Sequence, residues 1–355
     1  MMRTIWPVAC FLSTLLGTSV IAQVASLEIG GMRISPGRTQ LQLEVPGGAT
    51  DPATFIPVTV LRGSSPGPVL LAVSGVHGYE YAPILAAIRL VSDIDPDTLR
   101  GTLILVHPAN VAAFEARSPY VNPYDRKNLN RSFPGTPDGT QTERIAYTLS
   151  TELIAKADFV ADLHSGDGAE WLTAFVGVYG GPLATDYELA LAFAQATGFP
   201  NIVRYQMLTQ EQVDRGRSLN RQAVAQGLPT VLIEIGENGK REPSDIEAIV
   251  QGLKSGMVVL GMLPETDAVV PQVERYLDGT TSVPVSHSGL WYPNRTGGQD
   301  VEQGEELGVI KDYFGTIVET VVAPVSGYGI YGLAGPPVRA GESVMTIGIP
   351  VEQLR

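Results

Sequence analysis

The chain has 355 residues, of which 44% are hydrophobic and 17% are charged, so it can bury a full-sized core. Its 24 Lys and Arg against 37 Asp and Glu give a formal net charge of −13. Because like charges repel, this balance disfavours nucleic acid and anionic membrane surfaces as partners. The 39 Gly and 26 Pro follow no period, and apolar runs recur throughout, which excludes collagen, coiled coil and intrinsic disorder.

Residues 1–22 have the pattern of a cleaved secretory signal peptide. A basic start at Arg3 precedes an apolar stretch from Ile5 to about Leu16, and small residues lead up to Ala22. This apolar run is too short and too interrupted to span a bilayer comfortably, so we expect no membrane span in the mature chain. Cys10 is the one cysteine and lies inside this segment, so the mature chain would contain no disulfide and no thiolate metal site. We therefore expect an exported, periplasmic protein.

From about residue 27 to residue 263, apolar runs of strand length alternate with helical periodicity. We predict a hairpin over residues 26–43 that turns at Ser35-Pro36-Gly37. Strands are predicted at residues 55–61, 68–73, 101–106, 158–162, 172–178 and 229–233. Helices are predicted at residues 81–92, 140–157, 186–197, 217–226 and 244–262. This alternation predicts an α/β fold with a mixed, mostly parallel sheet flanked by helices on both faces.

The C-terminal part of the sequence has a different pattern. Residues 285–355 contain short strands, frequent glycine and no stretch of helical length, which is typical of a small β-barrel or sandwich. We therefore expect a catalytic α/β domain over residues 23–266, a linker over residues 267–284 and a small β-domain over residues 285–355.

Histidines and carboxylates follow two of the predicted strands. His77 and Glu80 are three residues apart at a strand-to-helix turn, where both side chains can face one ion. His164 ends another apolar strand. Two histidines and one carboxylate are a ligand set of catalytic zinc that leaves a position open for water. Each residue alone is more often structural, so the prediction of a metal site depends on the combination.

A further carboxylate, Glu234, ends the apolar segment from residue 229. An ionised group at that position is costly to bury unpaired, so it should face a metal, a cation or a cavity, although it can also point to solvent. The carboxyl ends of strands in an open α/β sheet form the edge that holds the active site. His77, His164 and Glu234 are all predicted to lie at that edge.

A loop rich in proline and arginine lies between these candidates. It contains Arg117, Arg126 and Arg131, and guanidinium groups bind carboxylates and stabilise oxyanions. Such a loop is therefore a candidate substrate clamp, and the alternative is a solvated surface loop.

Four segments occur in an order that resembles the succinylglutamate desuccinylase/aspartoacylase family, relatives of the zinc carboxypeptidases. They are His77-Gly78-Tyr79-Glu80, Asn128-Leu129-Asn130-Arg131-Ser132-Phe133-Pro134-Gly135, Asp162-Leu163-His164-Ser165-Gly166 and Glu234-Ile235-Gly236. The resemblance covers residues from about 50 to 350. Glycine-rich segments after residue 285 also resemble the small β-domain of the family. No Lys follows Lys311, so this region is not expected to carry a covalent cofactor; it either narrows the site or is purely structural.

The resemblance implies one Zn²⁺ per chain held by His77, Glu80 and His164, with Glu234 as general base. By the same resemblance, Asn130 and Arg131 would bind a substrate carboxylate. Arg117 would polarise the scissile carbonyl, and Arg126 is the alternative for that role. Family members usually carry Asp where this chain has Asn128, which bears on the geometry of the loop and on substrate preference.

The implied activity is hydrolysis of an amide bond in an N-acyl amino acid or a similar small, carboxylate-bearing substrate. The zinc and carboxylate part of this mechanism also follows from the residues themselves. One alternative is an exported carboxypeptidase that acts on peptides, including cell-wall peptides. Another is a non-catalytic zinc-binding protein, against which the presence of all three predicted ligands and Glu234 argues.

Overall fold

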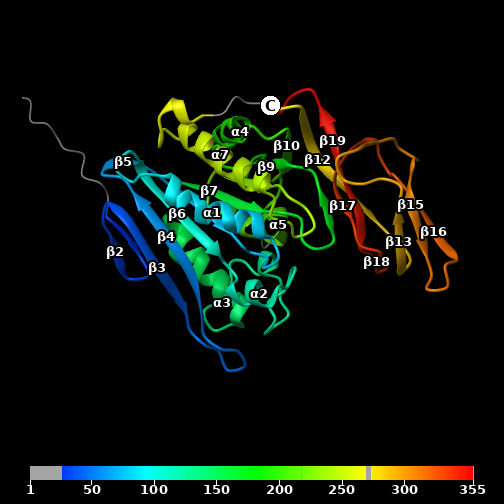
Figure 1. Cartoon of the computed structure of the whole chain (residues 1–355), viewed down its shortest axis with the longest axis horizontal. Coiled ribbons are helices and arrows are strands. Elements are labelled where there is room, and N and C mark those ends of the chain that lie inside the picture. The colour runs from blue at the N-terminus through cyan, green and yellow to red at the C-terminus, as the bar shows by residue number, and fades with distance from the viewer. Residues whose placement is uncertain (1–25, 217, 269–272, 355) are drawn as a thin grey trace, which may run out of the picture.

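The computed structural model describes residues 26–216, 218–268 and 273–354. Within these residues, the chain forms a 13-stranded mixed sheet, a four-stranded sheet and a two-stranded ribbon, with helices packed on the main sheet (Figure 1). The predicted α/β class is therefore confirmed. The predicted signal peptide lies outside the described residues. Among the described helices, none is long and apolar enough to cross a membrane.

The centre of the main sheet sets the position of the candidate residues. β5 (Ser65–Ser74) lies between β6 (Arg100–Pro108) and β7 (Phe159–His164), and β7 pairs in turn with β11 (Thr230–Glu234). All of these neighbouring pairs are parallel. Apolar side chains fill these strands almost without interruption, as expected where both faces of a sheet are covered. Because β5, β7 and β11 run in one direction, their carboxyl ends meet at one edge of the sheet.

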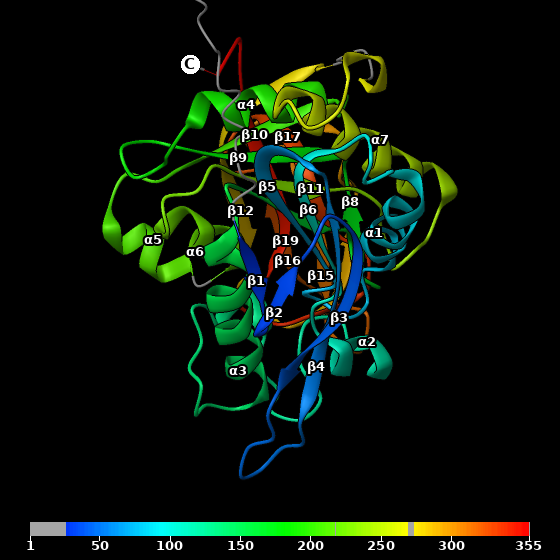
Figure 2. The same cartoon turned by 90° about the vertical axis from the view of Figure 1, so that its left-hand side faces the viewer.

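Helices cover both faces of this sheet, as the two sides of Figure 2 show. α1 (Tyr81–Asp93), α4 (Tyr187–Ala196) and α7 (Pro243–Val259) pack on one face and share one hydrophobic core. α3 (Gln141–Thr148) and α6 (Leu219–Ala225) contribute to the core on the other face. α1 shows how the sequence specifies this packing, because its buried residues recur at helical spacing along one side.

The N-terminal hairpin turns at a different place from the one predicted. β1 (Leu27–Ile29) and β2 (Met32–Ile34) pair around Gly30-Gly31, whose φ angles are 56° and 74°. Two consecutive residues with positive φ form the tight turn that suits paired strands, and glycine adopts it without strain. The predicted turn residues instead join β2 to β3 (Gly37–Val45), which pairs with β4 (Thr54–Arg62).

Some elements differ from the prediction in extent. The strand predicted over residues 172–178 is two strands, β8 (Glu170–Leu172) and β9 (Phe175–Gly180), because β8 leaves the centre of the sheet to pair with β17 (Gly327–Leu333). α3 continues through a π-helical turn (Leu149–Leu153) and a 3₁₀ turn (Ile154–Lys156), so the helix predicted to residue 157 is not a regular α-helix. The sequence patterns missed the elements α2 (Val111–Ala116), α5 (Gln210–Gly216) and β10 (Asn201–Gln206).

The predicted linker contains a strand of the main sheet. β12 (Arg275–Pro284) pairs in parallel with β10 and antiparallel with β19 (Ser343–Val351). Of its side chains only Leu277 and Val283 are buried and the others are partly buried or exposed, so the segment lacks the apolar run that identified the central strands. β12 therefore connects the central strands directly to β19, β17 (Gly327–Leu333) and β14 (Asp300–Val301).

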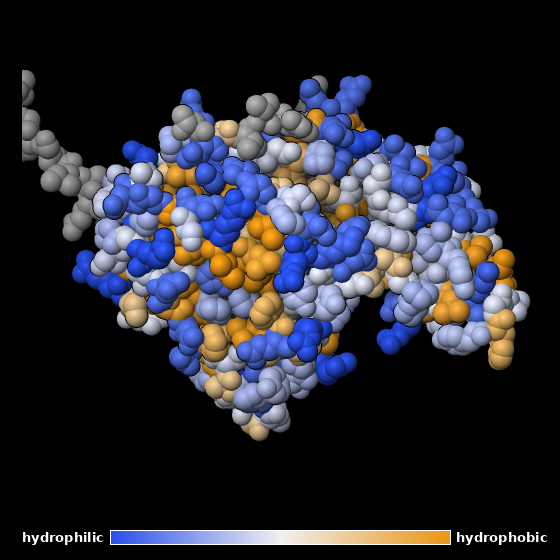
Figure 3. Space-filling model, in the orientation of Figure 1, coloured by the Kyte–Doolittle hydropathy of each residue, from blue (hydrophilic) through white to orange (hydrophobic). Residues whose placement is uncertain are grey.

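A separate four-stranded sheet completes the C-terminal region. Its strands, in spatial order, are β16 (Ile317–Val322), β15 (Glu306–Lys311), β13 (Gly289–Pro293) and β18 (Pro337–Val338). The turn between β15 and β16 exposes 95% of Phe314, and apolar atoms are visible at this outer end of the molecule in Figure 3.

Candidate active site

His77, Glu80 and His164 form a compact cluster where β5 and β7 end. One candidate ligand atom from each residue lies within 4.8 Å of the others, and all three residues are buried. His77 Nδ1 is 2.7 Å from Glu80 Oε1, and His164 Nδ1 is 2.8 Å from Glu80 Oε2. Two imidazole nitrogens and a carboxylate therefore face one point, and this donor set is one that catalytic zinc uses.

Local backbone geometry brings His77 and Glu80 together. Gly78 lies so close to α2 that an added Cβ would be 2.1 Å from the Ala113 carbonyl carbon. Only glycine therefore fits at position 78, in the turn between His77 and Glu80. Glu80 is the N-cap residue of α1, but its carboxylate makes no capping bond and turns toward the histidines instead. The positive end of the α1 dipole favours a carboxylate there.

The Nε2 atoms of the two histidines, which are the ring nitrogens not directed at Glu80, have different partners. His77 Nε2 is 3.1 Å from Asn128 Oδ1, a neutral amide oxygen that also accepts the Asn130 backbone N–H at 2.7 Å. His164 Nε2 is 3.1 Å from a carboxylate oxygen of the fully buried Asp162, without hydrogen-bond geometry. Such outer partners orient metal ligands and tune their basicity.

The charges of the clustered side chains favour a cation between them. Burial alone would raise the pKa of Glu80, but the adjacent His164 and His77 lower it below its usual range. For His164, burial acts to lower the pKa, while the negative charges of Asp162 and Glu80 raise it well above normal. Groups arranged in this way stabilise a cation between them.

Glu234 lies beside this cluster at the end of β11. Its register partner in the parallel strand β7 is His164, so the two side chains leave neighbouring strands at the same level. Burial raises the pKa of Glu234 well above its usual range, His164 opposes this shift, and the carboxylates of Glu80 and Glu170 add to it. Glu234 is therefore a strongly perturbed acid next to the candidate metal site, as catalytic acid–base groups often are.

All four of these residues line one pocket of about 310 Å³. Its other polar walls come from η1 (Leu129–Arg131), from α6 and the residue before it, and from β8. β17 and β19 close a further side with Ile330, Tyr331 and Thr346. The pocket is thus built by segments that lie between residue 77 and residue 346.

Two arginines give the pocket a cationic part. Arg131 and Arg221 both line it, and among the described residues neither forms an ion pair with an acidic side chain. Arg131 remains exposed to solvent at the pocket, yet surrounding protein and the charge of Arg221 lower the pKa of its guanidinium group. Asn130 holds the two elements together, because its Oδ1 accepts the Leu219 backbone N–H at 3.0 Å. Two neighbouring guanidinium groups without an acidic partner form a ready site for a carboxylate.

The catalytic-domain profile of the succinylglutamate desuccinylase/aspartoacylase family matches residues 66–260. An N-alpha-acetyl-L-2,4-diaminobutyric acid deacetylase of Halomonas elongata is 30% identical over 307 residues, which cover 85% of this chain and 88% of that protein. The chain belongs to this family.

Solved structures agree with this membership. The product-bound ectoine utilization protein EutE (DoeB) of Ruegeria pomeroyi has a TM-score of 0.77 and 26% identity, and the match covers 89% of this chain and 96% of that one. A succinylglutamate desuccinylase/aspartoacylase of Rhodobacter sphaeroides has the same fold with a TM-score of 0.77 at 21% identity, over 94% of this chain and all of its own. The names of the Halomonas and Rhodobacter proteins describe a deacetylase of an N-acetyl amino acid and a desuccinylase/aspartoacylase, that is, deacylases.

Two arginines named from the family pattern lie away from the pocket. Arg117 caps the C-terminus of α2 with a φ of 52°, and Arg126 turns the following loop with a φ of 60°. Both side chains are exposed, and neither lines the pocket. The sequence could not show which arginines of this loop line the pocket, because that depends on the left-handed backbone conformation of Arg117 and Arg126. A catalytic role for Arg117 or Arg126 stays a prediction without geometric support.

Other pocket residues were not identified from the sequence. Arg221 was hidden within a predicted helix, and Tyr331 lies in the C-terminal region. Tyr120 donates a short hydrogen bond to Glu170, and burial together with the nearby Asp167 raises the pKa of Glu170 to about 7. Glu170 has one weak sequence signal, since it follows shortly after the segment Asp162-Leu163-His164-Ser165-Gly166 that resembles the family.

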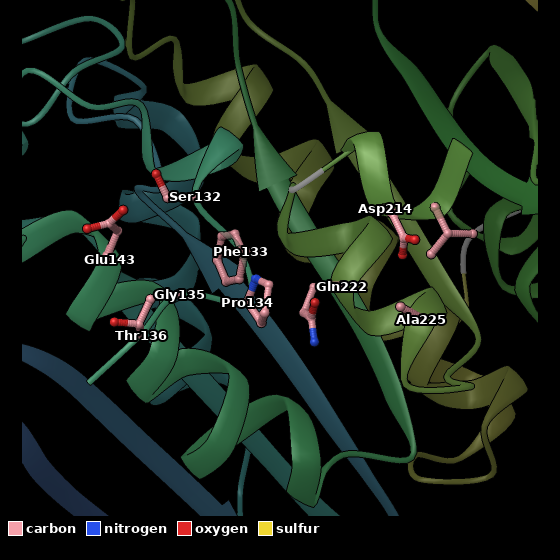
Figure 4. A pocket seen from close by; sticks show the side chains of 10 residues that line it. Ser132, Phe133, Pro134, Gly135, Thr136, Glu143, Asp214, Gln222 and Ala225 are labelled. Carbon is pink, nitrogen blue, oxygen red and sulfur yellow. The ribbon is translucent and has the colours of Figure 1, made fainter. Parts of the chain in front are cut away.

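A second pocket of about 370 Å³ lies between the loop after η1 and helices α5 and α6 (Figure 4). Its carboxylates already have partners, because Glu143 caps α3 and pairs with Lys127, and Asp214 accepts a hydrogen bond from Gln210. None of the three candidate metal ligands lines it. We assign the chemistry to the pocket at the strand ends.

Proposed function

We propose that this protein is a zinc-dependent deacylase that hydrolyses the amide bond of N-acyl amino acids. The observation that carries the proposal is the meeting of His77, Glu80, His164 and Glu234 in one pocket. The first three residues would hold Zn²⁺, and the proposal assigns one ion to each chain. Family membership and the deacetylase relative support the same type of reaction.

Bound zinc would polarise the acyl carbonyl and lower the pKa of the attacking water. Glu234 is the base in this proposal: its carboxylate takes the proton from the water and then delivers that proton to the leaving amine. The metal charge nearby would favour the ionised carboxylate, which burial otherwise disfavours. Asp162 would hold the ring of His164 in place from the outer side.

The cationic part of the pocket would bind the free carboxylate of the substrate. Arg131 and Arg221 supply the charge, and Asn130 fixes the position of Arg131 relative to α6. Holding the carboxylate would orient the amide toward Glu234 and so reduce the entropic cost of reaction. Ser165 also lines the pocket, and its buried hydroxyl has no hydrogen-bond partner among the described residues.

The proposal also includes export, by removal of residues 1–22 as a signal peptide, to the periplasm. The basic start, the short apolar stretch and the small residues before Gln23 support it. N-terminal sequencing of the exported protein tests it, and we expect a start near Gln23. Retention of residues 1–22 would contradict it.

The activity is tested by supplying the purified protein with zinc and offering two substrate panels. One contains N-acetyl and N-succinyl amino acids, and the other contains peptides with free C-termini, including cell-wall peptides. We expect hydrolysis of the acyl amino acids, because the pocket volume of about 310 Å³ suits a small substrate. Exclusive hydrolysis of peptides would show a carboxypeptidase instead, and no hydrolysis in either panel would contradict the proposal.

A further inference from the structure

We propose that an apolar floor of the pocket binds the side chain of the substrate amino acid, so that the preferred substrates are N-acyl amino acids with bulky apolar side chains. This inference rests on the deacylase function proposed above and narrows its substrate class.

An apolar surface begins beside Glu234 on one face of the main sheet. Leu232 lies two residues before Glu234 on β11, so both side chains point to the same face of the sheet. In the antiparallel neighbour β9, Phe175 is the register partner of Glu234, and Gly177 is the partner of Leu232. Leu232, Phe175 and Glu234 all line the pocket. The proposed base therefore lies at the end of an apolar surface that the proposed reaction does not use.

Two tyrosines extend this surface across β9 and β10. Gly177 has no side chain, and a Cβ added there would be 2.8 Å from Cε2 of Tyr205 and 3.2 Å from Cβ of Leu232. The Tyr205 ring therefore lies over Gly177, next to Leu232. This ring also stacks on the ring of Tyr179, its register partner in β9, with 5.6 Å between centroids. The surface is thus continuous from the end of β11 to the two stacked rings.

The side chains of this surface line the pocket and carry no formal charge. We call them the apolar floor, and they are Leu172, Phe175, Tyr179, Tyr205, Leu232 and Ile330. Phe175, Leu232 and Ile330 belong to one buried hydrophobic cluster, against which Leu172 and Tyr205 pack. Burial raises the pKa of the Tyr179 and Tyr205 phenols, so both rings stay neutral. A charged group placed on this floor would lose its water without gaining an ionic partner, whereas an apolar group is stabilised there.

The cationic part of the pocket determines which part of the substrate reaches the floor. Arg221 and Val224 are three residues apart on α6, and residues at this spacing share one face of a helix. Val224 belongs to the same buried cluster as Tyr179, and the charge of Arg221 acts to lower the pKa of the Tyr179 phenol. Arg221 therefore lies beside the Tyr179 end of the floor. The side chain of an amino acid shares the α-carbon with its carboxylate, so a carboxylate held by Arg131 and Arg221 would place the side chain on the floor. The acyl group would lie beyond the amide bond.

The alternative is that the floor is only hydrophobic core. Two truncations on β11 separate these roles, because Leu232→Ala and Ile233→Ala remove the same number of carbon atoms from opposite faces of one strand. Leu232 belongs to the floor. Ile233 is fully buried in the core that α1, α4 and α7 share, and it does not line the pocket. Ile233→Ala is therefore the matched control for a loss of stability without a change in the pocket.

The experiment measures kcat/KM of the zinc-loaded protein for the Nα-acetyl derivatives of leucine, alanine, aspartate and 2,4-diaminobutyrate, and for N-hexanoylalanine. Aspartate and diaminobutyrate have side chains of a size similar to that of leucine but carry a charge. We expect the wild type to prefer acetylleucine over acetylalanine by about 10- to 100-fold, the range for burying about three further carbon atoms, and to prefer it over both charged substrates. Leu232→Ala should reduce the ratio of leucine to alanine by about three- to tenfold, whereas Ile233→Ala should change it by less than about twofold.

A wild type that prefers a charged substrate, or that shows no preference for leucine over alanine, would overturn the inference, and this comparison does not depend on whether the variants fold. Equal changes of the ratio in Leu232→Ala and Ile233→Ala would show that the floor acts only as core. A loss in Leu232→Ala that is confined to N-hexanoylalanine would assign the floor to the acyl group instead. In each of these cases hydrolysis of acetylalanine leaves the deacylase function intact. Failure to hydrolyse any N-acyl amino acid would remove the proposed function and this inference with it.

Discussion

The centre of the main sheet and its C-terminal strands both line the pocket, but they bring different chemistry to it. His77 follows the end of β5, and β7 and β11 end in His164 and Glu234, whereas β17 and β19 contribute Ile330, Tyr331 and Thr346. The first set can bind a metal and transfer protons, and the second set contains no carboxylate or basic group. Within the described chain, the proposed reaction therefore depends on residues at the ends of three parallel strands, and the later strands form a further wall of the cavity.

The largest expected effect lies on the central strands. His164→Ala removes one of the three proposed ligands from a buried site, so stoichiometric zinc should be lost, and deacylase activity with it. Metal analysis of the dialysed protein, with His287→Ala as the control, measures this directly. His287 is exposed and lies far from the cluster in sequence, in the C-terminal region. Unchanged zinc content in His164→Ala would contradict the ligand assignment.

A smaller effect is expected at the outer partners of the two histidines. Asn128→Asp would give His77 a charged partner like the one that Asp162 gives His164, and this should tighten zinc binding by about tenfold. The matched reverse change, Asp162→Asn, should weaken binding by a similar factor. Competition with a chromophoric chelator measures both. Equal affinities in all three proteins would show that these outer groups do not tune the metal site.

The smallest effect is expected on the C-terminal strands. Tyr331→Phe removes a hydroxyl from the pocket wall but leaves the metal ligands and the proposed base, so zinc content should be unchanged and kcat should fall by less than about tenfold. Zinc analysis and steady-state kinetics on one N-acyl amino acid measure these effects. A fall in kcat of about 10²-fold or more, as expected for loss of a proton-transfer group, would show that the C-terminal strands also take part in the chemistry. That result would contradict the difference described here between the central and the C-terminal strands.

The same contrast explains what the sequence could predict. The strands that end in the candidate residues are buried on both faces, so each is an uninterrupted apolar run and its last residue can be found directly. β12 has only two buried positions, Leu277 and Val283, among partly buried and exposed ones, and it was predicted to be part of a linker. Tyr331 reaches the pocket only because β17 pairs with β8 and β19, and no local pattern indicates pairing at such separations.

In the candidate site, too, the sequence could not predict which individual residues line the pocket. Arg117, Arg126 and Arg131 occur in one loop and have the same chemistry, yet only Arg131 lines the pocket. The other two have left-handed backbone conformations, and their exposed side chains do not line the pocket. Arg221 completes the cationic part from α6, a contribution that depends on helix α6 packing next to η1.

The central claim is that Glu234 activates water beside a metal that His77, Glu80 and His164 hold. The most direct test measures zinc content and kcat together in Glu234→Gln, with Glu237→Gln as the control. Glu237 is ion-paired to Lys240 in the loop after β11 and does not line the pocket. Glutamine keeps the shape of Glu234 but cannot accept the proton, so we expect about one zinc per chain and a fall in kcat of about 10²- to 10⁴-fold or more. Near-normal turnover in Glu234→Gln, with zinc still bound, would contradict the account, and a simultaneous loss in Glu237→Gln would move the base to Glu237.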